Sequence, residues 1–441
     1  MQFNSIEFIF GFLPLFLIIY YLAPEKWRNS ILLFGSIAFL ELVGSTWHVL
    51  MLVILTMVTF LEGAVLARKK SKGLLALFLA ILFGCLGFFK YFRGGRLLPA
   101  GLSFYLFQMT AYLVDVYRGN LPTEYNLVRY STQIMMFPKL LSGPLMNPAD
   151  LQRQTWARGY LHRNFYRGIQ EFVLGLSLKA LLADRMAGLW NQVGIIGYES
   201  ISPLLAWMAL LAFALRLYFD FFGYSLMAIG IGRMLGFDLP QNFDDPYASK
   251  TVSEFYRRWH ITLGAWFRDY LYIPLGGSRN GTFRTILNLG VVWLATGIWH
   301  GIGGNYLVWA GFLLLLIIIE KLWIGKTLQR SKILGHIYTP VMILLSWVPF
   351  AIGDFGKMKV YLGRLIGLGG QTLNSMDFVT IGKPYWGLLL AGILFATPLP
   401  GKVWKRLRSS PAGMAITIIL FWLVVFFLST AKQDPFMYFQ Y

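Results

Sequence analysis

Apolar runs close to 20 residues long recur along the whole of this 441-residue chain. A helix needs about 20 residues to cross the hydrocarbon core of a bilayer, where backbone polar groups must be bonded within the segment. Hydrophobic residues make up 57% of the sequence, whereas charged residues make up 13%. Soluble domains carry roughly 25% charged residues. The sequence therefore predicts an all-α polytopic membrane protein with about 10–12 crossings, plus re-entrant or interfacial helices.

The candidate membrane segments share low charge, and several are shortened by glycine or proline. They are 6–23, 30–46, 48–67, 73–92, 99–117, 127–145, 167–184, 203–222, 223–237, 284–300, 304–323, 333–352, 384–399 and 411–430. We expect one membrane domain over 1–441. Its parts are N-terminal helices (1–240), an amphipathic cytoplasmic-side segment (241–281), C-terminal helices (282–430) and an aromatic tail (431–441).

The net charge of +19 comes from 39 Lys and Arg against 20 Asp and Glu. In a membrane protein this excess is typical of cytoplasmic loops, so we expect no nucleic-acid partner, and membrane lipids as contacts. Lys26 and Arg28 follow the first apolar run, and further basic residues lie at 68–72 and 401–410. Placing these loops inside puts both termini on the extracytoplasmic side.

His300 lies in "LATGIWHGIGGN" (294–305), at the end of an apolar run and among glycines. An ionisable residue within a membrane domain costs roughly 3 kcal/mol or more and usually faces an interior cavity. Glycines allow backbone or substrate to approach the ring closely. His300 is therefore the first candidate for a catalytic residue, and a neutral packing histidine is the alternative.

His260 lies in "RRWHITL", within the charged and aromatic segment 241–281. A helix rich in Trp, Tyr and Arg fits the membrane interface, so an interfacial histidine is the alternative to a functional one. Ser253 precedes "EFYRRW" and is the expected helix cap.

Several kinds of catalytic site are missing from the sequence. It contains no His-x-x-x-His, no HExxH and no cysteine cluster, so we expect no metal. Neither Gly-x-Ser-x-Gly nor a phosphate-binding loop with its Lys-Ser/Thr pair is present. What remains is a histidine acting as general base in a dry interior.

The motifs around both histidines resemble those of the membrane-bound O-acyltransferase family. The matching stretches are "DDPYASKTVSEFYRRWHITLGAWFRDYLYIPLGGSRNG", "ATGIWHGIGGNYLVWAGF", "GLSFYLFQMTAYLVDVYRG" and "FPKLLSGPL". The resemblance covers roughly 5–441 and is strongest to the bacterial polysaccharide branch, typified by the membrane subunit of alginate O-acetylation. It implies helices around a central funnel, with His300 as the catalytic histidine and His260 as a second functional residue in a tunnel joining both faces.

The same resemblance implies an acyltransferase of the bacterial cytoplasmic membrane. An acyl thioester, acetyl-CoA or an acyl carrier protein, is the expected cytoplasmic donor, with no bound cofactor. His300 would take the acceptor's proton, and His260 would orient a substrate or stabilise the oxyanion. Arg257, Arg258 and Arg268 are candidates to hold a donor phosphate, with interfacial arginines as the alternative.

The tail "PFMYFQY" (435–441) raises the question of how an acyl group would cross the membrane. Tyr438 is the expected relay, acylated with His300 as base and then unloaded by an extracytoplasmic SGNH-type transferase onto a polysaccharide. Tyr441 is the alternative carrier. A purely interfacial aromatic anchor is the alternative for the whole tail.

Other functions stay open at this point. D-alanyl or other acyl transfer to teichoic acid or peptidoglycan fits neighbouring branches of the family. A transporter of a lipid-linked glycan is disfavoured because no repeated halves are seen. A third possibility, a non-catalytic scaffold protein, would not explain why His300 is buried.

Overall fold

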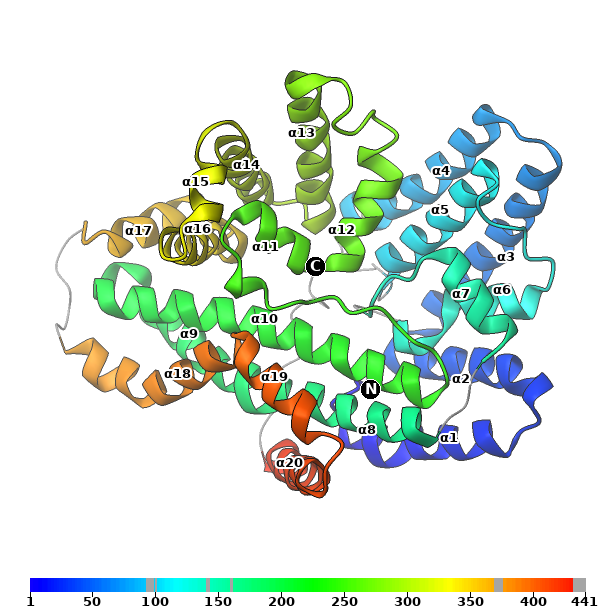
Figure 1. Ribbon diagram of the computed structural model, residues 1–441, viewed down its shortest axis with the longest axis horizontal. Coiled ribbons are helices and arrows are strands. Elements are labelled where there is room, and N and C mark those ends of the chain that lie inside the picture. Colours follow the sequence, from blue (N-terminus) through cyan, green and yellow to red (C-terminus); the bar gives the residue numbers. More distant parts are fainter. Residues whose placement is uncertain (93–98, 100, 140–142, 159–161, 369–375, 431–441) are drawn as a thin grey trace. The chain divides into compact units, whose positions relative to one another are not determined.

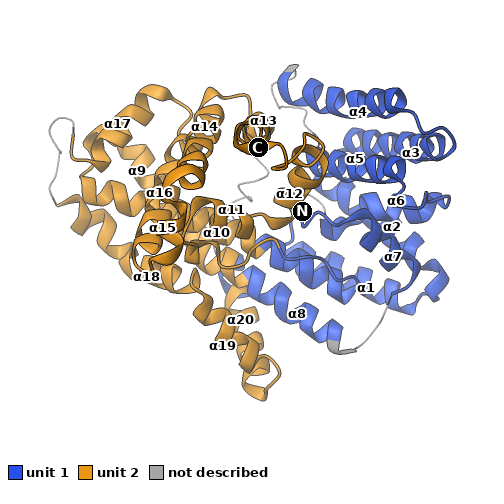
Figure 2. Ribbon diagram, turned by 45° about the horizontal axis from the view of Figure 1, so that its top comes forward, with its two compact units in different colours: residues 1–176, 224–241, 425–440 blue, residues 177–223, 242–424, 441 orange. Residues whose placement is uncertain are grey.

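A computed structural model describes residues 1–92, 99, 101–139, 143–158, 162–368 and 376–430 (Figure 1). Regular structure in these ranges is helical, apart from one isolated antiparallel bridge between Phe243 and Trp259. The predicted all-α class is confirmed. The described chain forms two compact units, unit 1 with 1–176, 224–241 and 425–430, and unit 2 with 177–223 and 242–424 (Figure 2). The expected single membrane domain stays a prediction.

Seven helical segments of the described chain are long and apolar enough to cross a membrane. They are Thr46–Arg68, Lys72–Tyr91, Pro203–Met234, Gly304–Arg330, Leu334–Ala351, Phe378–Phe395 and Pro411–Thr430, and a shorter apolar helix spans Glu7–Leu22. The polytopic membrane fold is thus confirmed, while the total of ten to twelve crossings stays a prediction. The runs 203–222 and 223–237 were expected to be separate, but they form one 32-residue helix, α10.

Unit 1 holds the N-terminal helices, in which α5 packs against α3 and α4, and α2 packs against α6 (Figures 1 and 2). Its elements are η1 (Glu7–Phe12), α1 (Leu13–Leu22), η2 (Glu25–Trp27), α2 (Arg28–Val43), α3 (Thr46–Arg68), α4 (Lys72–Gly87), η3 (Phe88–Phe92), α5 (Leu102–Arg118), α6 (Leu127–Met135), η4 (Phe137–Lys139), α7 (Pro148–Trp156) and α8 (His162–Ser177). The apolar run 127–145 is interrupted after Met135. There the Phe137 N–H donates to Ser36 Oγ at 3.0 Å, which satisfies a backbone group freed by the break.

Unit 2 holds the remaining helices, and α14 packs against both α13 and α16. Its elements are η5 (Leu178–Ala183), α9 (Asp184–Ile196), η6 (Tyr198–Ser200), η7 (Pro246–Ala248), α11 (Val252–Arg258), α12 (Ile261–Phe267), η8 (Arg268–Tyr272), α13 (Gly281–His300), α14 (Gly304–Ile319), η9 (Glu320–Ile324), α15 (Gly325–Arg330), α16 (Leu334–Ala351), α17 (Phe355–Leu365), η10 (Phe378–Gly382), η11 (Lys383–Tyr385), α18 (Trp386–Phe395) and α19 (Pro398–Leu407). Helix α10 (Pro203–Met234) continues from unit 2 into unit 1, as does α20 (Pro411–Thr430).

A buried ion cluster joins η5, α9 and α10 within unit 2. Lys179 Nζ lies 2.5 Å from Asp184 Oδ1 and 2.8 Å from Asp220 Oδ1. The Lys179 side chain is 1% exposed, and its charge is compensated by the two carboxylates. Removing one partner would leave an uncompensated buried charge. The cluster therefore stabilises the packing of the middle of α10 against η5 and α9.

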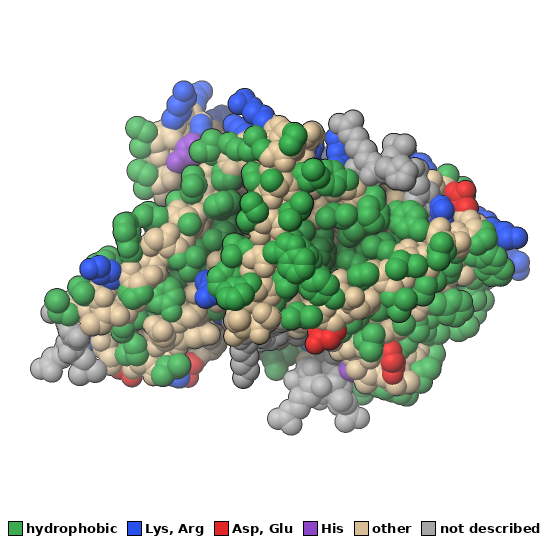
Figure 3. Space-filling view, turned by 90° about the horizontal axis from the view of Figure 1, so that it is seen from below, with side chains coloured by type: hydrophobic (Ala, Val, Ile, Leu, Met, Phe, Trp, Pro, Cys, Tyr) green, Lys and Arg blue, Asp and Glu red, His purple; other side chains and the backbone are tan. Residues whose placement is uncertain are grey.

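Large apolar side chains are exposed on the membrane-length helices. Leu61 on α3 and Ile419 on α20 are each more than half exposed, and apolar side chains cover much of the face shown in Figure 3. Soluble monomers rarely expose large contiguous apolar patches, whereas lipid tails solvate them. The exposed surface therefore agrees with the membrane assignment made from helix length.

Helices α8 and α10 approach each other closely at a pair of glycines in unit 1. A Cβ at Gly168 would lie 2.5 Å from the Gly230 carbonyl oxygen and 3.0 Å from the Met234 nitrogen. Both of these neighbours are backbone atoms, which cannot move aside as a flexible side chain could. The crossing therefore depends on the absence of a side chain at position 168.

We expect Gly168→Ala to destabilise the protein by about 1–3 kcal/mol, because the added methyl group forces the two helices apart. The control is Gly84→Ala on α4, where an added Cβ meets nothing within 4 Å. That substitution should leave stability unchanged or slightly raised. Thermal unfolding of the detergent-solubilised proteins measures both, and equal melting temperatures would contradict the close crossing.

Candidate functional site

His300 is the last residue of α13, and a tight turn leads from it into α14. Glycines make the turn and the helix pair possible. A Cβ at Gly301 would overlap the Tyr306 ring, and one at Gly297 would lie 3.0 Å from both the Ala310 Cβ and the Tyr306 carbonyl oxygen. The glycines around His300 therefore bring α13 and α14 into close contact beside its imidazole.

His300 is 7% exposed, and its imidazole is surrounded by aromatic rings. The ring centroids lie 4.6 Å away for Trp299, 4.9 Å for Trp309, 5.2 Å for Phe350 and 6.1 Å for Tyr306. We call these four residues the aromatic cage. An apolar cage strengthens any charge or hydrogen bond formed within it, because little water is present to screen it.

His260 adopts a left-handed backbone conformation, with φ 46° and ψ 53°, between α11 and α12. This conformation is uncommon for residues other than glycine and is most accessible to Asn and Asp. The strand-like segment 242–244 holds the turn in place. Ile261 N–H donates to the Asn242 carbonyl at 2.9 Å, and Asp244 N–H donates to the Arg258 carbonyl at 3.0 Å. Such strain is common at functional sites.

The Asn242 side chain determines how the His260 ring is protonated. Its Oδ1 accepts from the Thr262 hydroxyl at 2.6 Å and from the Thr262 N–H at 3.4 Å, which identifies this atom as the oxygen. His260 Nδ1 lies 3.3 Å from the same oxygen and must therefore carry the proton and donate it. His260 is 5% exposed, and burial lowers its pKa to about 3. The ring is thus neutral, with a lone pair on Nε2.

Glu320 fixes the start of α11, the short helix that leads to His260. It lies in the π-helical turn η9, is 5% exposed, and accepts hydrogen bonds from Val252 N–H at 2.6 Å, Ser253 N–H at 3.0 Å and Ser253 Oγ at 2.7 Å. The helix cap itself is Thr251, whose hydroxyl accepts from Glu254 N–H. The expected cap at Ser253 is therefore wrong by two residues, because Ser253 is already inside the helix and bonds Glu320 instead.

The two histidine-bearing segments meet on one group of aromatic side chains in unit 2. Trp259, next to His260, lies 5.4 Å from Trp347 between ring centroids. Trp347 in turn lies 5.3 Å from Phe350 and 6.4 Å from Trp309, both members of the aromatic cage. The tunnel expected between the histidines stays a prediction.

The other expected site residues are less closely associated with the histidines. Arg258 pairs with Glu254 at 2.8 Å, and Arg268 binds Asp269 through two hydrogen bonds of 2.7 and 3.0 Å. Arg257 is exposed on α11. Tyr438 lies outside the described residues. In the described ranges, no group of three or more His, Cys, Asp or Glu is arranged to hold a metal ion.

Sequence reasoning missed Asn242 and Glu320. A single acidic residue at the end of the apolar run 304–323 is a signal that could have identified Glu320, because an ionisable group at such a place needs a partner. Asn242 has no comparable signal, since it is one of many polar residues in the segment 241–281.

Comparison with known proteins places these motifs in a family. The sequence model of the membrane-bound O-acyltransferase family matches residues 8–348. A protein named probable alginate O-acetylase, from Pseudomonas putida, is 32% identical over 100% of both chains. Its counterpart from Pseudomonas aeruginosa is 35% identical, covering 90% of this chain and 81% of its own. A peptidoglycan O-acetyltransferase from Helicobacter pylori is 31% identical, covering 68% of this chain and 64% of its own.

The similarity thus extends over most of the chain, and the family model includes the segments that carry His260 and His300. The family expected from the sequence motifs is confirmed, and with it an O-acyltransferase activity in a multi-pass membrane protein. The chain belongs to the membrane-bound O-acyltransferase family.

Proposed function

We propose that this protein takes an acyl group, acetyl in the first instance, from a cytoplasmic thioester and passes it across the bacterial cytoplasmic membrane to O-acylate an extracytoplasmic polysaccharide. The observation that carries the proposal is the buried His300 in its aromatic cage, at the end of a glycine-lined turn. The names of the alginate O-acetylase and peptidoglycan O-acetyltransferase relatives support an extracytoplasmic glycan as the final acceptor.

In the chemical step, a ring nitrogen of His300 takes the proton of an acceptor hydroxyl, which in this proposal is the Tyr438 hydroxyl. The hydroxyl oxygen attacks the thioester carbonyl carbon, the C–S bond breaks, and the leaving thiolate takes the proton back from the imidazolium. The products are an O-ester and a free thiol. The cage supports this role, because a base acts most strongly where water does not compete for its lone pair.

His260 orients the acceptor hydroxyl in this proposal. Because Nδ1 donates to Asn242, the neutral ring offers only a lone pair at Nε2. A lone pair accepts a hydrogen bond from a hydroxyl but cannot stabilise an oxyanion, which needs a donor. Of the two roles open to His260, the hydrogen-bonding pattern therefore favours orientation.

The donor is acetyl-CoA or an acyl carrier protein, reaching the site from the cytoplasm. Arg257 is the best placed of the three candidate arginines to meet a donor phosphate, because it is exposed. Arg258 and Arg268 already bind carboxylates and would contribute less.

The acyl group then leaves on the opposite side of the membrane. Tyr438 is the proposed carrier, emerging outside after α20, whose preceding loop is basic and therefore cytoplasmic. Both termini are extracytoplasmic in this arrangement. An SGNH-type transferase would move the group from the tyrosine ester to the polysaccharide.

His300→Ala should abolish thioester-dependent acyl transfer, and His300→Gln should do the same, because glutamine keeps a hydrogen bond but supplies no base. A loss of about 100-fold or more in turnover is expected from removal of a general base. Turnover is measured with the purified protein and a labelled thioester, with thermal unfolding as the control for folding. Retained turnover would show that His300 is not the catalytic base. Loss of folding in both variants would show that His300 has a structural role instead.

His260→Asn should keep more activity than His260→Ala, because asparagine tolerates the left-handed backbone that alanine resists. Asn242→Leu should lower activity as well, since the Nδ1 proton then loses its acceptor and the tautomer is no longer fixed. The measurement is the turnover of the labelled thioester, alongside the rate at which the tail is acylated. Wild-type values for Asn242→Leu would refute the orienting role of His260.

Protein stability should fall on acidification below pH 6.5 in a way that depends on His260. The unfolded histidine has a pKa of about 6.5, and the folded pKa is lowered to about 3. Between these values the unfolded chain binds more protons, so stability is highest above pH 6.5 and falls by up to about 1.4 kcal/mol per pH unit toward pH 3. Between pH 6.5 and pH 3 the wild type should lose more stability than His260→Asn, as measured by unfolding at a series of pH values. Parallel stability profiles of the two proteins would show that His260 does not titrate in this way.

Tyr438→Phe should stop acylation of the polysaccharide while the protein still folds and still consumes thioester slowly. Mass spectrometry of the isolated tail should find one added acyl group in the wild type and none in the variant. Tyr441→Phe is the matched control. Normal polysaccharide acylation by Tyr438→Phe would refute Tyr438 as the carrier, and normal acylation by the Tyr438→Phe/Tyr441→Phe double variant would mean that the tail is only an anchor.

A further inference from the structure

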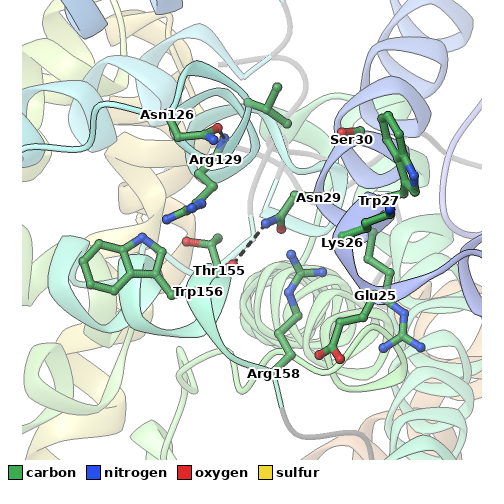
Figure 4. A pocket seen from close by; sticks show the side chains of 12 residues that line it. Glu25, Lys26, Trp27, Asn29, Ser30, Asn126, Arg129, Thr155, Trp156 and Arg158 are labelled. Atoms are coloured by element: carbon green, nitrogen blue, oxygen red, sulfur yellow. Dashed lines mark hydrogen bonds between the residues drawn. The ribbon is translucent and has the colours of Figure 1, made fainter.

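A polar pocket of about 580 Å³ lies in unit 1, where η2 leads into α2 and where α6 begins (Figure 4). It is well separated in sequence from both histidines and from their aromatic cage. The residues that line it are Glu25, Lys26, Trp27, Arg28, Asn29, Ser30, Asn126, Val128, Arg129, Thr155, Trp156 and Arg158.

The charge of the lining is strongly positive. Four cations, Lys26, Arg28, Arg129 and Arg158, face a single carboxylate, Glu25. Lys26 and Arg129 form no ion pair with any residue that the structure describes. The charge on these two side chains is therefore available to an anion from outside the protein.

Two polar side chains of the lining, Arg158 and Asn29, are held in place by contacts with neighbouring residues. Arg158 Nη1 donates to the Tyr20 hydroxyl at 2.5 Å, and its guanidinium lies 4.5 Å over the Phe237 ring. Asn29 Nδ2 donates to the Thr155 carbonyl at 3.0 Å (Figure 4). A ligand entering the pocket therefore meets donors that are already positioned, which lowers the entropy lost on binding.

The pocket adjoins the end of an apolar helix and carries exposed tryptophans. It follows directly after the apolar helix Glu7–Leu22, and α2 begins in its wall at Arg28. Trp27 and Trp156 belong to its lining and are each more than half exposed. Tryptophan is enriched where a membrane protein meets the lipid headgroups.

We propose that this pocket binds the phosphate of an anionic phospholipid headgroup, with Arg129 and Lys26 as its principal charge partners. A guanidinium matches the geometry of phosphate oxygens through paired hydrogen bonds, and an ammonium adds a point charge. The exposed tryptophans favour a lipid over a soluble phosphate compound, because they place the opening among the headgroups. This lipid belongs to the inner leaflet in the orientation given under the proposed function, on which this one point rests.

The test is native mass spectrometry of the full-length protein in neutral detergent. The protein is titrated with phosphatidylglycerol or with phosphatidylcholine of the same acyl chains. We expect tighter binding of phosphatidylglycerol, weakened about tenfold by Arg129→Gln, the loss expected for one hydrogen bond to a charged group. Arg129→Lys should keep an intermediate affinity, since it retains the charge.

Arg153→Gln is the matched control, because it removes the same charge from α7 while its side chain is 76% exposed and does not line the pocket. Equal weakening by Arg153→Gln and Arg129→Gln would mean that a general surface field binds the lipid, and it would overturn the site. Equal binding of the two lipids would overturn it too. Displacement of phosphatidylglycerol by an equal concentration of inorganic phosphate would assign the pocket to a soluble phosphate and overturn the lipid assignment. Thermal unfolding of Arg129→Gln confirms that the variant is folded.

Discussion

The need to bond every backbone polar group within an apolar environment governs this structure. It accounts for the long helices, and it also accounts for what happens where a helix stops. After Met135 the chain is held by the contact of Phe137 with Ser36, and at the start of α11 a carboxylate from another helix, Glu320, meets two backbone N–H groups. Each interruption brings polar atoms to a buried place, and His260 lies at a further one, between α11 and α12.

The candidate site combines two different solutions to the burial of a histidine. His300 is surrounded by aromatic rings at the end of a helix, and the glycines beside it let the neighbouring helix come close. His260 is held by hydrogen bonds from a strand-like segment and sits in a left-handed turn. The first arrangement suits a group that exchanges a proton in a dry environment, and the second suits one whose protonation is fixed.

The sequence predicts the helical membrane fold well, because helix length and apolar composition are local properties. It also predicts His300 and His260 as candidates, since a polar residue in an apolar or aromatic setting is visible without a structure. It does not predict that 203–222 and 223–237 form one helix, because the glycines there serve helix packing at Gly230 and do not break the helix. Nor does it reveal Asn242, whose role depends on a contact with a residue 18 positions away.

The aromatic cage also bears on the fate of an activated acyl group. Water is a competing nucleophile in any thioester reaction, and a base that activates a hydroxyl activates water equally well. An enzyme that transfers acyl groups without hydrolysing the thioester must therefore have a site whose shape excludes water from the catalytic base. Trp309 and Phe350 meet the His300 ring nearly edge-on, at 83° and 80°, and cover it from two helices. Under the proposed function, the division between transferase and thioesterase behaviour would thus depend on side chains that take no part in the chemistry.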